Sequence, residues 1–256
     1  MKKHTLLLLL LLTVTFTFSQ TKAFKKGEVL KYRVSYSNFF NAGSATLKVT
    51  ETKNKGKEAF HIIGKGKTTG VTGWFFNVKD IYQSYFYKES MLPYRFLRKI
   101  NEGGYKKNKE IIFNQATNKA TVKDHKHNKQ SNHTTHGEVQ DMISTLYYLR
   151  SKDISKMKTG DIVTLTMFFD EKNYPFKLKL LGREVIKTKF GKVAAVKFRP
   201  IVQAGRVFKE KESITVWVSD DKNKIPLRIK ASLAVGSLRA DLDMYKGLRN
   251  SFPIIF

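Results

Sequence analysis

ITVWVSDDKNKIPLRIKASLAVGSLRADLDMY, residues Ile214–Tyr245, is the stretch of sequence that decides the fold. At its start, Ile214, Val216 and Val218 are separated by single residues that face the other way, which is the period-two pattern of a β-strand. A polar turn follows at Asp220–Lys224, and a second alternating run continues to the end of the stretch. The pattern predicts two long antiparallel strands joined by a turn.

The second run changes phase at Gly236. Apolar side chains occupy odd positions from Leu227 to Val235, and even positions from Leu238 to Met244. A β-bulge corrects such a one-residue change of face and bends the strand. At about 3.3 Å per residue, a straight run would extend roughly 60 Å. We therefore expect the strand to bulge and bend at Gly236, within a strongly curved antiparallel sheet that forms a barrel or half-barrel.

Further strands are predicted along most of the chain. Alternating or apolar runs occupy residues 30–36, 45–49, 81–87, 94–100, 163–169, 176–180 and 193–198. The run Ile81–Tyr87 is apolar or aromatic on both faces, which indicates that protein or a ligand covers its second face. All-β domains commonly contain 200 to 250 residues, so we expect residues 20–256 to form a single, mainly β domain.

One segment has the period of a helix. Thr135 and Glu138 have the spacing of a capping box, and a row of apolar residues then recurs on one face at helical spacing. This row consists of Val139, Met142, Ile143, Leu146 and Leu149. We expect one helix from about residue 136 to 150, packed on the sheet, after a polar loop at residues 124–136.

The N-terminus has the features of a secretory signal peptide. A basic head, Lys2–Lys3, precedes the leucine run Leu6–Leu12, which is shorter than the ~20 residues of a membrane span. We expect residues 1–19 to be the signal peptide, and the protein to be exported to the periplasm or, alternatively, the exterior. The chain has no cysteine, which excludes a disulfide, thiol catalysis and a lipid-bearing cysteine.

The net charge is +27, from 48 basic and 21 acidic residues. In an exported protein, this charge predicts attraction to anionic envelope components rather than to nucleic acid. A lysine-rich solvated surface without a specific partner is the alternative. We expect no stable membrane insertion.

Several aromatic residues are candidates for contact with an apolar ligand. Trp74, Phe75 and Phe76 form a run after a glycine, and could cap a ligand or belong to the core. Tyr85 lies in the run Ile81–Tyr87, which is apolar or aromatic on both faces. Trp217, like the run after the glycine, could contact a ligand or belong to the core.

The sequence gives only weak signals for a metal site or a catalytic site. His125, His127, His133 and His136 form a cluster that could reach a metal, but neighbouring lysines would repel a cation. We therefore predict no metal site and no cofactor. Asp241 and Asp243 share a strand face beside basic residues, which favours ion pairs over acid–base catalysis. No phosphate loop, nucleophile elbow or metalloprotease helix is present, and no catalytic residue is predicted.

The chain also resembles an exported bacterial family known only as a domain of unknown function (DUF3108-like). The resemblance rests on Gly27–Tyr32 with Ala42–Gly43, Glu102–Tyr105, Asp141–Arg150, Val216–Asp221, Ile225–Arg228 and Gly236–Leu242. It covers nearly the whole chain after the signal peptide and implies no catalytic residues. A looser similarity, through the strand–turn–Pro–x–Arg hairpin, is to periplasmic lipoprotein carriers, which hold acyl chains in half-barrel sheets.

These observations lead to three functional hypotheses. The first is a non-enzymatic envelope protein that binds a lipid or another apolar ligand in its curved sheet. The second is an interaction or assembly factor that docks on anionic glycan or an envelope protein through basic loops. The third, an enzyme, ranks last because no acid, base and nucleophile converge in the sequence.

Overall fold

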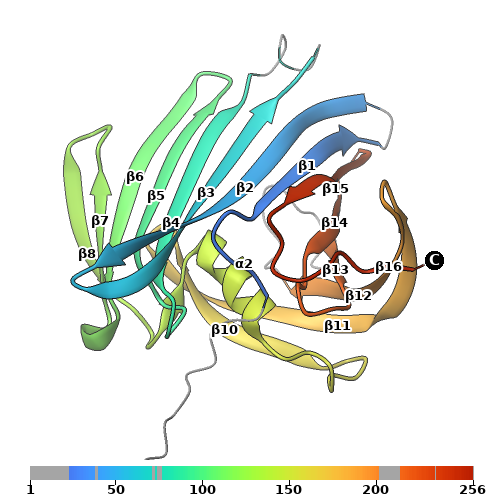
Figure 1. The fold of residues 1–256 in the computed structure, drawn as a ribbon. Helices are drawn as coiled ribbons and strands as arrows, with labels where there is room; N and C mark the ends of the chain where they lie inside the picture. Colours follow the sequence, from blue (N-terminus) through green and yellow to red (C-terminus); the bar gives the residue numbers. More distant parts are fainter. Residues whose placement is uncertain are drawn as a thin grey trace, which may run out of the picture.

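The chain forms one strongly curved, largely antiparallel sheet that holds a short helix on its concave side (Figure 1). The computed structural model describes residues 23–37, 40–70, 73, 77–201, 214–233 and 235–255. The expected signal peptide and the aromatic run Trp74–Phe76 lie outside these residues. Within the described residues, no helix is long and apolar enough to cross a membrane.

The elements have the following bounds. The strands are β1 (Val29–Tyr36), β2 (Phe40–Asn54), β3 (Lys57–Thr68), β4 (Lys79–Tyr87), β5 (Pro93–Glu102), β6 (Tyr105–Asn114), β7 (Lys119–Asp124), β8 (Lys129–Thr134), β9 (Val139–Gln140), β10 (Ile162–Phe169), β11 (Lys172–Thr188), β12 (Gly191–Ile201), β13 (Ile214–Ser219), β14 (Pro226–Ser232), β15 (Ser237–Lys246) and β16 (Ile254–Ile255), and the helix is α2 (Met142–Ser151).

The strand order joins the two ends of the chain. It runs β8-β7-β6-β5-β4-β3-β2-β1-β15-β14-β13-β12-β11-β10-β9, with β16 added to β12. Neighbours are antiparallel except for β9 and β10. The first strand therefore lies beside the last long strand, with Tyr32 opposite Leu242. The order ends at β8 and β9 and is not closed, so the sheet is curved and barrel-like, as the alternating pattern predicts.

The predicted single strand through Gly236 is wrong. Residues on either side of it form the hairpin β14–β15, in which Ser232 lies opposite Ser237, and the N–H of Leu233 donates to the carbonyl oxygen of Gly236 at 3.1 Å. Gly236 has φ +72°, and a Cβ there would lie 2.5 Å from Oγ of Ser37. The phase changes because the chain reverses direction.

The curvature comes from irregularities elsewhere in the ladder. Trp217 lies opposite Arg228 and Val218 lies opposite Pro226, so Leu227 is an extra residue in β14. Opposite β1, Ala42 is an extra residue in β2 and Asp243 is an extra residue in β15, and Leu181 is an extra residue in β11. Each such bulge bends and twists its strand, and together they curl the sheet.

The helix begins later than its predicted start at residue 136. Asp141 is the N-cap: its Oδ1 accepts hydrogen bonds from the N–H groups of Ile143 and Ser144, and the hydroxyl of Ser144 accepts from the N–H of Asp141. Val139 and Gln140 instead pair with β10 as a short strand. The predicted polar loop at 124–136 is also wrong in part, because Lys129–Thr134 forms β8.

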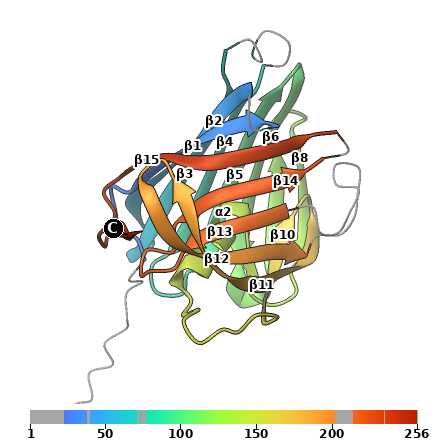
Figure 2. The same cartoon turned by 90° about the vertical axis from the view of Figure 1, so that its right-hand side faces the viewer.

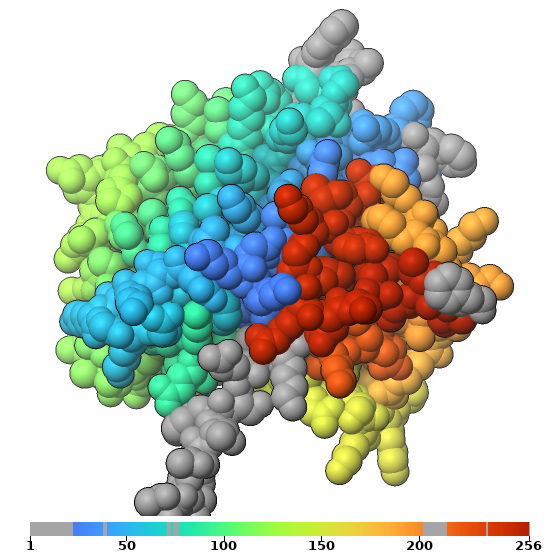
Figure 3. Space-filling view, viewed as in Figure 1, coloured from blue at the N-terminus to red at the C-terminus, as the bar shows by residue number. Residues whose placement is uncertain are grey.

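The buried side chains form three clusters. One lies between α2 and strands of the N-terminal half and contains Phe60, Phe86, Phe96 and Tyr147. A second joins β1, β14 and β15 to the distal part of the β11–β12 hairpin and to the C-terminal segment. In Figure 3, C-terminal residues (red) fill this side of the molecule. The third lies beneath the C-terminal end of α2.

Candidate functional site

Helix α2 lies inside the curl of the sheet, behind β13 and β14 in Figure 2. Its N-terminus is fixed by Asp141, whose side chain is fully buried and accepts a 2.6 Å hydrogen bond from the hydroxyl of Ser84 on β4. Burial raises the pKa of Asp141 to about 6, although the hydrogen bonds from Ser84, Ser144 and Ile143 lower it.

The C-terminal end of the helix is fixed by Arg150. Its guanidinium, 2% exposed, makes a two-pronged ion pair with the fully buried carboxylate of Glu28, at 2.6 and 2.9 Å. It also donates to the carbonyl oxygens of Ala23 and Asn223, and lies over the ring of Tyr147. One side chain thus joins the N-terminal segment, the helix and the β13–β14 turn.

Between these two anchors, the helix covers an apolar cavity of about 220 Å³. Its roof is the helix face formed by Met142, Leu146 and Leu149. The walls and floor come from β10 to β14 and the segment after the helix, through Ile154, Val163, Met167, Phe176, Leu178, Phe198, Pro200, Val216, Val218, Pro226 and Ile229. The inward faces of five neighbouring strands therefore leave space beneath the helix instead of closing on it.

Cations border the cavity near the C-terminal end of the helix. Lys152, Lys224 and Arg150 line it there. Lys152 is exposed and Lys224 is half-buried. Partial burial lowers the pKa of Lys224, Arg150 lowers it further, and Asp153 and Asp221 oppose the shift. Arg150 is already paired with Glu28, so the two lysines are the charges available to a ligand.

The chemistry of the lining favours binding over reaction. Among the residues that line the cavity, none is an acid or a histidine, and the hydroxyl of Thr145 donates to the backbone oxygen of Asp141 at 2.7 Å. A general acid, a base and a nucleophile do not converge there. Apolar walls with cations at one end suit an apolar ligand that carries a negative group.

Two of the predicted aromatic site residues, Tyr85 and Trp217, are not among the residues that line this cavity. Tyr85, on β4, stacks on His61 with ring centroids 4.0 Å apart and lies beneath the guanidinium of Arg95. Trp217 alternates with the cavity residues of β13, and its indole N–H donates to Glu184. The structure keeps Tyr85 and Trp217 apart, and Trp74, Phe75 and Phe76 lie outside the described residues.

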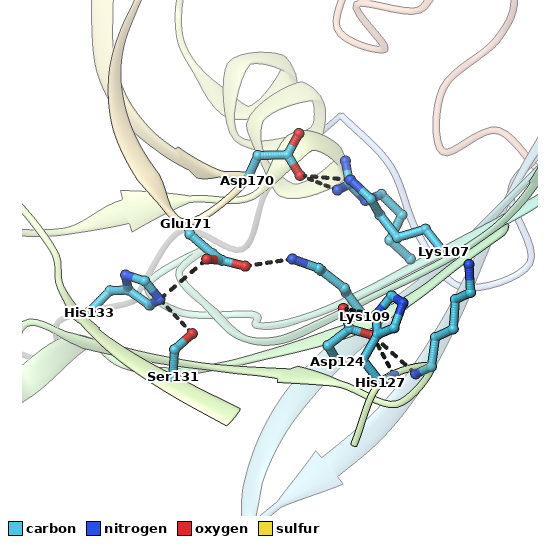
Figure 4. Close-up of polar contacts among 10 residues, drawn as sticks. Lys107, Lys109, Asp124, His127, Ser131, His133, Asp170 and Glu171 are labelled. Atoms are coloured by element: carbon cyan, nitrogen blue, oxygen red, sulfur yellow. Dashed lines mark hydrogen bonds and ion pairs between the residues drawn. The ribbon is translucent and has the colours of Figure 1, made fainter. Parts of the chain in front are cut away.

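The four histidines of the predicted cluster bind separate partners. His125 contacts Glu110. His127 contacts Asp124, and Nε2 of His133 lies 2.8 Å from the hydroxyl of Ser131 (Figure 4). The backbone N–H of His136 donates to the side-chain oxygen of Asn173. In the described part of the chain, no three His, Cys, Asp or Glu side chains are grouped so as to hold a metal ion.

An acidic hairpin tip docks beside His133, whose Nε2 lies 3.9 Å from the carboxylate of Glu171 (Figure 4). Asp170 and Glu171 form the β10–β11 turn with φ of 44° and 66°, as in the turns that favour tight hairpins. Asp170 pairs with Arg98 and Lys107, and Glu171 pairs with Lys109 at 2.5 Å. The hairpin that forms one wall of the cavity is thereby tied to β5 and β6.

The sequence contained the pattern of the cavity residues but not their role. Val216 and Val218 recur two positions apart, and Val163 and Met167 four positions apart. This spacing correctly placed each pair on one face of its strand. The helical spacing grouped Met142, Leu146 and Leu149. Whether such faces pack together or leave a space depends on the tertiary arrangement, which the local pattern does not specify.

Comparison with solved structures places the fold among barrel-like proteins. The chain matches a β-barrel-like protein of the domain of unknown function DUF1849 from Brucella abortus with a TM-score of 0.56 and 10% identity, over 88% of this chain and 99% of that chain. This likeness concerns the fold alone.

Two further solved structures match with lower TM-scores. A candidate lipoprotein from Parabacteroides distasonis matches with a TM-score of 0.38 and 11% identity, over 90% of this chain and 98% of that chain. The lipoprotein LppX of Mycobacterium tuberculosis matches with a TM-score of 0.18 and 12% identity, over 90% of each chain.

Among curated proteins, none matches the chain. The family described as "Protein of unknown function (DUF3108)" matches residues 31–243. This region extends from β1 into β15 and contains α2 and every strand that contributes to the cavity wall. The resemblance expected from the sequence is confirmed, and the protein belongs to the DUF3108 family.

Proposed function

We propose that the protein is a non-enzymatic, exported protein of the cell envelope that binds an acyl chain with an anionic head group in the cavity beneath α2. The proposal rests on the lining of this cavity, whose walls are apolar and which has two lysines, Lys152 and Lys224, at one end. Export rests on the N-terminal leucine run Leu6–Leu12, and the intact mass of the recovered protein would show whether that segment is removed.

The dimensions favour a single narrow chain. The cavity of about 220 Å³ is slightly smaller than the roughly 300–1,000 Å³ of typical ligand pockets. It extends from Met142 to Lys152, ten residues of helix or about 15 Å. An acyl chain could lie along the helix with its head group near the lysines, whereas a lipid with two chains would need a larger space.

The test is the binding of a fluorescent long-chain fatty acid to the purified protein. Val216→Phe, which fills the cavity, should weaken binding by roughly tenfold or more, about 1.4 kcal/mol. Thr215→Phe is the matched control, because it adds the same ring to the opposite face of β13 and should change affinity less than twofold. Native mass spectrometry should also detect lipid bound to the wild-type protein.

The role of the lysines is tested with a second pair of variants. Lys152→Gln/Lys224→Gln should weaken binding of the fatty acid but leave competition by the matching fatty alcohol unchanged. The control, Lys156→Gln/Lys222→Gln, removes two exposed charges from the same segments. If the wild-type protein binds neither fatty acid nor alcohol, or if Val216→Phe and Thr215→Phe behave alike, the proposal is wrong.

A further inference from the structure

The outer face of the N-terminal half of the sheet carries an array of exposed lysines. We call it the basic face, and it consists of Lys31, Lys65, Lys67, Lys79, Lys99 and Lys106, on β1, β3, β4, β5 and β6. The strand register arranges these residues in two rows. One row contains Lys31, Lys65 and Lys99, connected through Thr46 and Ile81. The other contains Lys67 and Lys79 directly opposite each other, with Lys106 farther along opposite Asn101.

This arrangement opposes the stability of the sheet. Like charges directly opposite each other on neighbouring strands are destabilising. Among the described residues, no carboxylate lies within ion-pair distance of these six lysines. The nearby carboxylate of Glu110 is already paired with Arg95 and His125. The basic face therefore has an unbalanced positive charge that an external anion could neutralise.

A surface groove of about 490 Å³ lies within the basic face. Lys79, Lys99, Lys106 and Lys126 line it, together with the half-buried apolar side chain of Ile81, and no acidic residue contributes to its lining. The groove is on the outer side of β4–β6, whereas the cavity beneath α2 is on the concave side of β10–β14. The two features are separate.

We propose that the basic face docks the protein on the surface of a bilayer that contains anionic lipids. Lysine ammonium groups act as point charges without the fixed planar geometry of arginine, which suits mobile lipid phosphates. Ile81 places an apolar side chain among the cations, as in surfaces that contact both head groups and acyl chains. Among the described residues, the outer-face tyrosine rings of β4 and β5 that could stack on a base, Tyr85, Tyr87 and Tyr94, lie toward the other end of these strands, which favours a lipid surface over single-stranded nucleic acid.

The test is co-sedimentation with vesicles of phosphatidylcholine alone or mixed with phosphatidylglycerol. The wild-type protein should bind the anionic vesicles, should not bind the neutral ones, and should be released by salt because the Debye length shortens. Lys67→Gln/Lys79→Gln/Lys99→Gln/Lys106→Gln should bind the anionic vesicles at least tenfold more weakly. It should remain folded, since it removes repulsion.

The matched control removes the same charge elsewhere. Lys156→Gln/Lys172→Gln/Lys192→Gln/Lys230→Gln changes four exposed lysines outside the basic face and should weaken vesicle binding less than threefold. Equal loss in both variants would show that net charge alone acts, and would overturn the proposal. So would a basic-face variant that loses binding to a soluble acidic polysaccharide but keeps full binding to vesicles. Fatty acid binding by the basic-face variant should be unchanged, so that this proposal and the cavity proposal can fail independently.

Discussion

At the scale of single residues, the buried Arg150–Glu28 pair connects parts of the chain that are 122 positions apart. Both side chains are almost fully removed from solvent, at 2% and 0% exposure. Removing one partner of a buried pair leaves an uncompensated charge, which is more costly than the pair is stabilising. The Arg150 side chain is therefore essential for placing α2 over the cavity.

Arg150→Met should lower the free energy of unfolding by about 3–5 kcal/mol. The double variant Glu28→Gln/Arg150→Met should lose less than the sum of the single changes, because neither charge is left alone. Urea unfolding measures both effects. Arg249→Met, at an exposed position, serves as the control, and an equal loss there would contradict the assignment.

Asp141 makes stability depend on pH in the direction opposite to most carboxylates. Its pKa rises from an ordinary 3.8 to about 6 on folding, so between pH 6 and 4 the folded state holds a proton that the unfolded chain lacks. The destabilisation from this residue is complete above pH 6 and is relieved as the pH falls toward 4, by up to about 1.4 kcal/mol per pH unit.

The comparison of the wild-type protein with Asp141→Asn isolates this contribution. Asparagine can keep the bonds to the backbone and to Ser84, but it does not titrate. The stability of the wild type relative to the variant should rise as the pH is lowered from 6 to 4, and stay constant above pH 7. Asp153→Asn should give an almost constant difference between pH 6 and 4 and the opposite sign below about pH 4, because hydrogen bonds from Ser155 lower the pKa of Asp153 from its ordinary 3.8. A pH-independent difference for Asp141→Asn would refute the argument.

At the scale of elements, the β10–β11 hairpin is fixed by charge at its tip. Arg98 is buried, with 7% of its side chain exposed, and its carboxylate partner Asp170 belongs to the tip. Exposed ion pairs contribute little to stability, but a buried guanidinium without its partner is costly. The tip therefore stabilises the hairpin more than a surface pair would.

Asp170→Asn/Glu171→Gln should reduce the free energy of unfolding by about 1–3 kcal/mol and increase hydrogen exchange in β10 and β11. Glu58→Gln is the control, since Glu58 and its partner Lys53 are half or more exposed and its second partner, Lys88, keeps its ion pair with Glu51. It should change stability by less than about 0.5 kcal/mol. Comparable effects from the two changes would show that the tip is an ordinary surface contact.

The elements also show what the sequence can and cannot predict. Alternation is a local property, so most strands were predicted correctly. At Gly236, a bulge and a hairpin produce the same change of phase, and the choice depends on the pairing of Ser232 with Ser237. Both Thr135 and Asp141 begin possible capping boxes. The hydrogen bond from Ser84, 57 residues away, favours Asp141.

At the scale of the whole molecule, the cavity was beyond local prediction. Its lining comes from α2, five strands and the segments that follow the helix and β13. Its volume is the small space that remains between the curved sheet and the helix after the side chains have filled the rest. The net charge of the chain predicted an anionic partner, but we expected the contact to lie on basic loops. The register between strands, which no single strand contains, is what gathers lysines on one face of the sheet.

The pairing of β1 with β15 also determines how this chain must fold. Residues 29–36 pair with residues 40–48 on one side, but their partner on the other side, residues 238–246, is synthesised near the end of the chain, so the two halves of the sheet join late. Contacts between such distant residues carry a large loop-closure entropy and slow folding. The consecutive strands β1 to β8 can pair as they are synthesised, whereas the junction of β1 with β15 has to wait until the chain is almost complete.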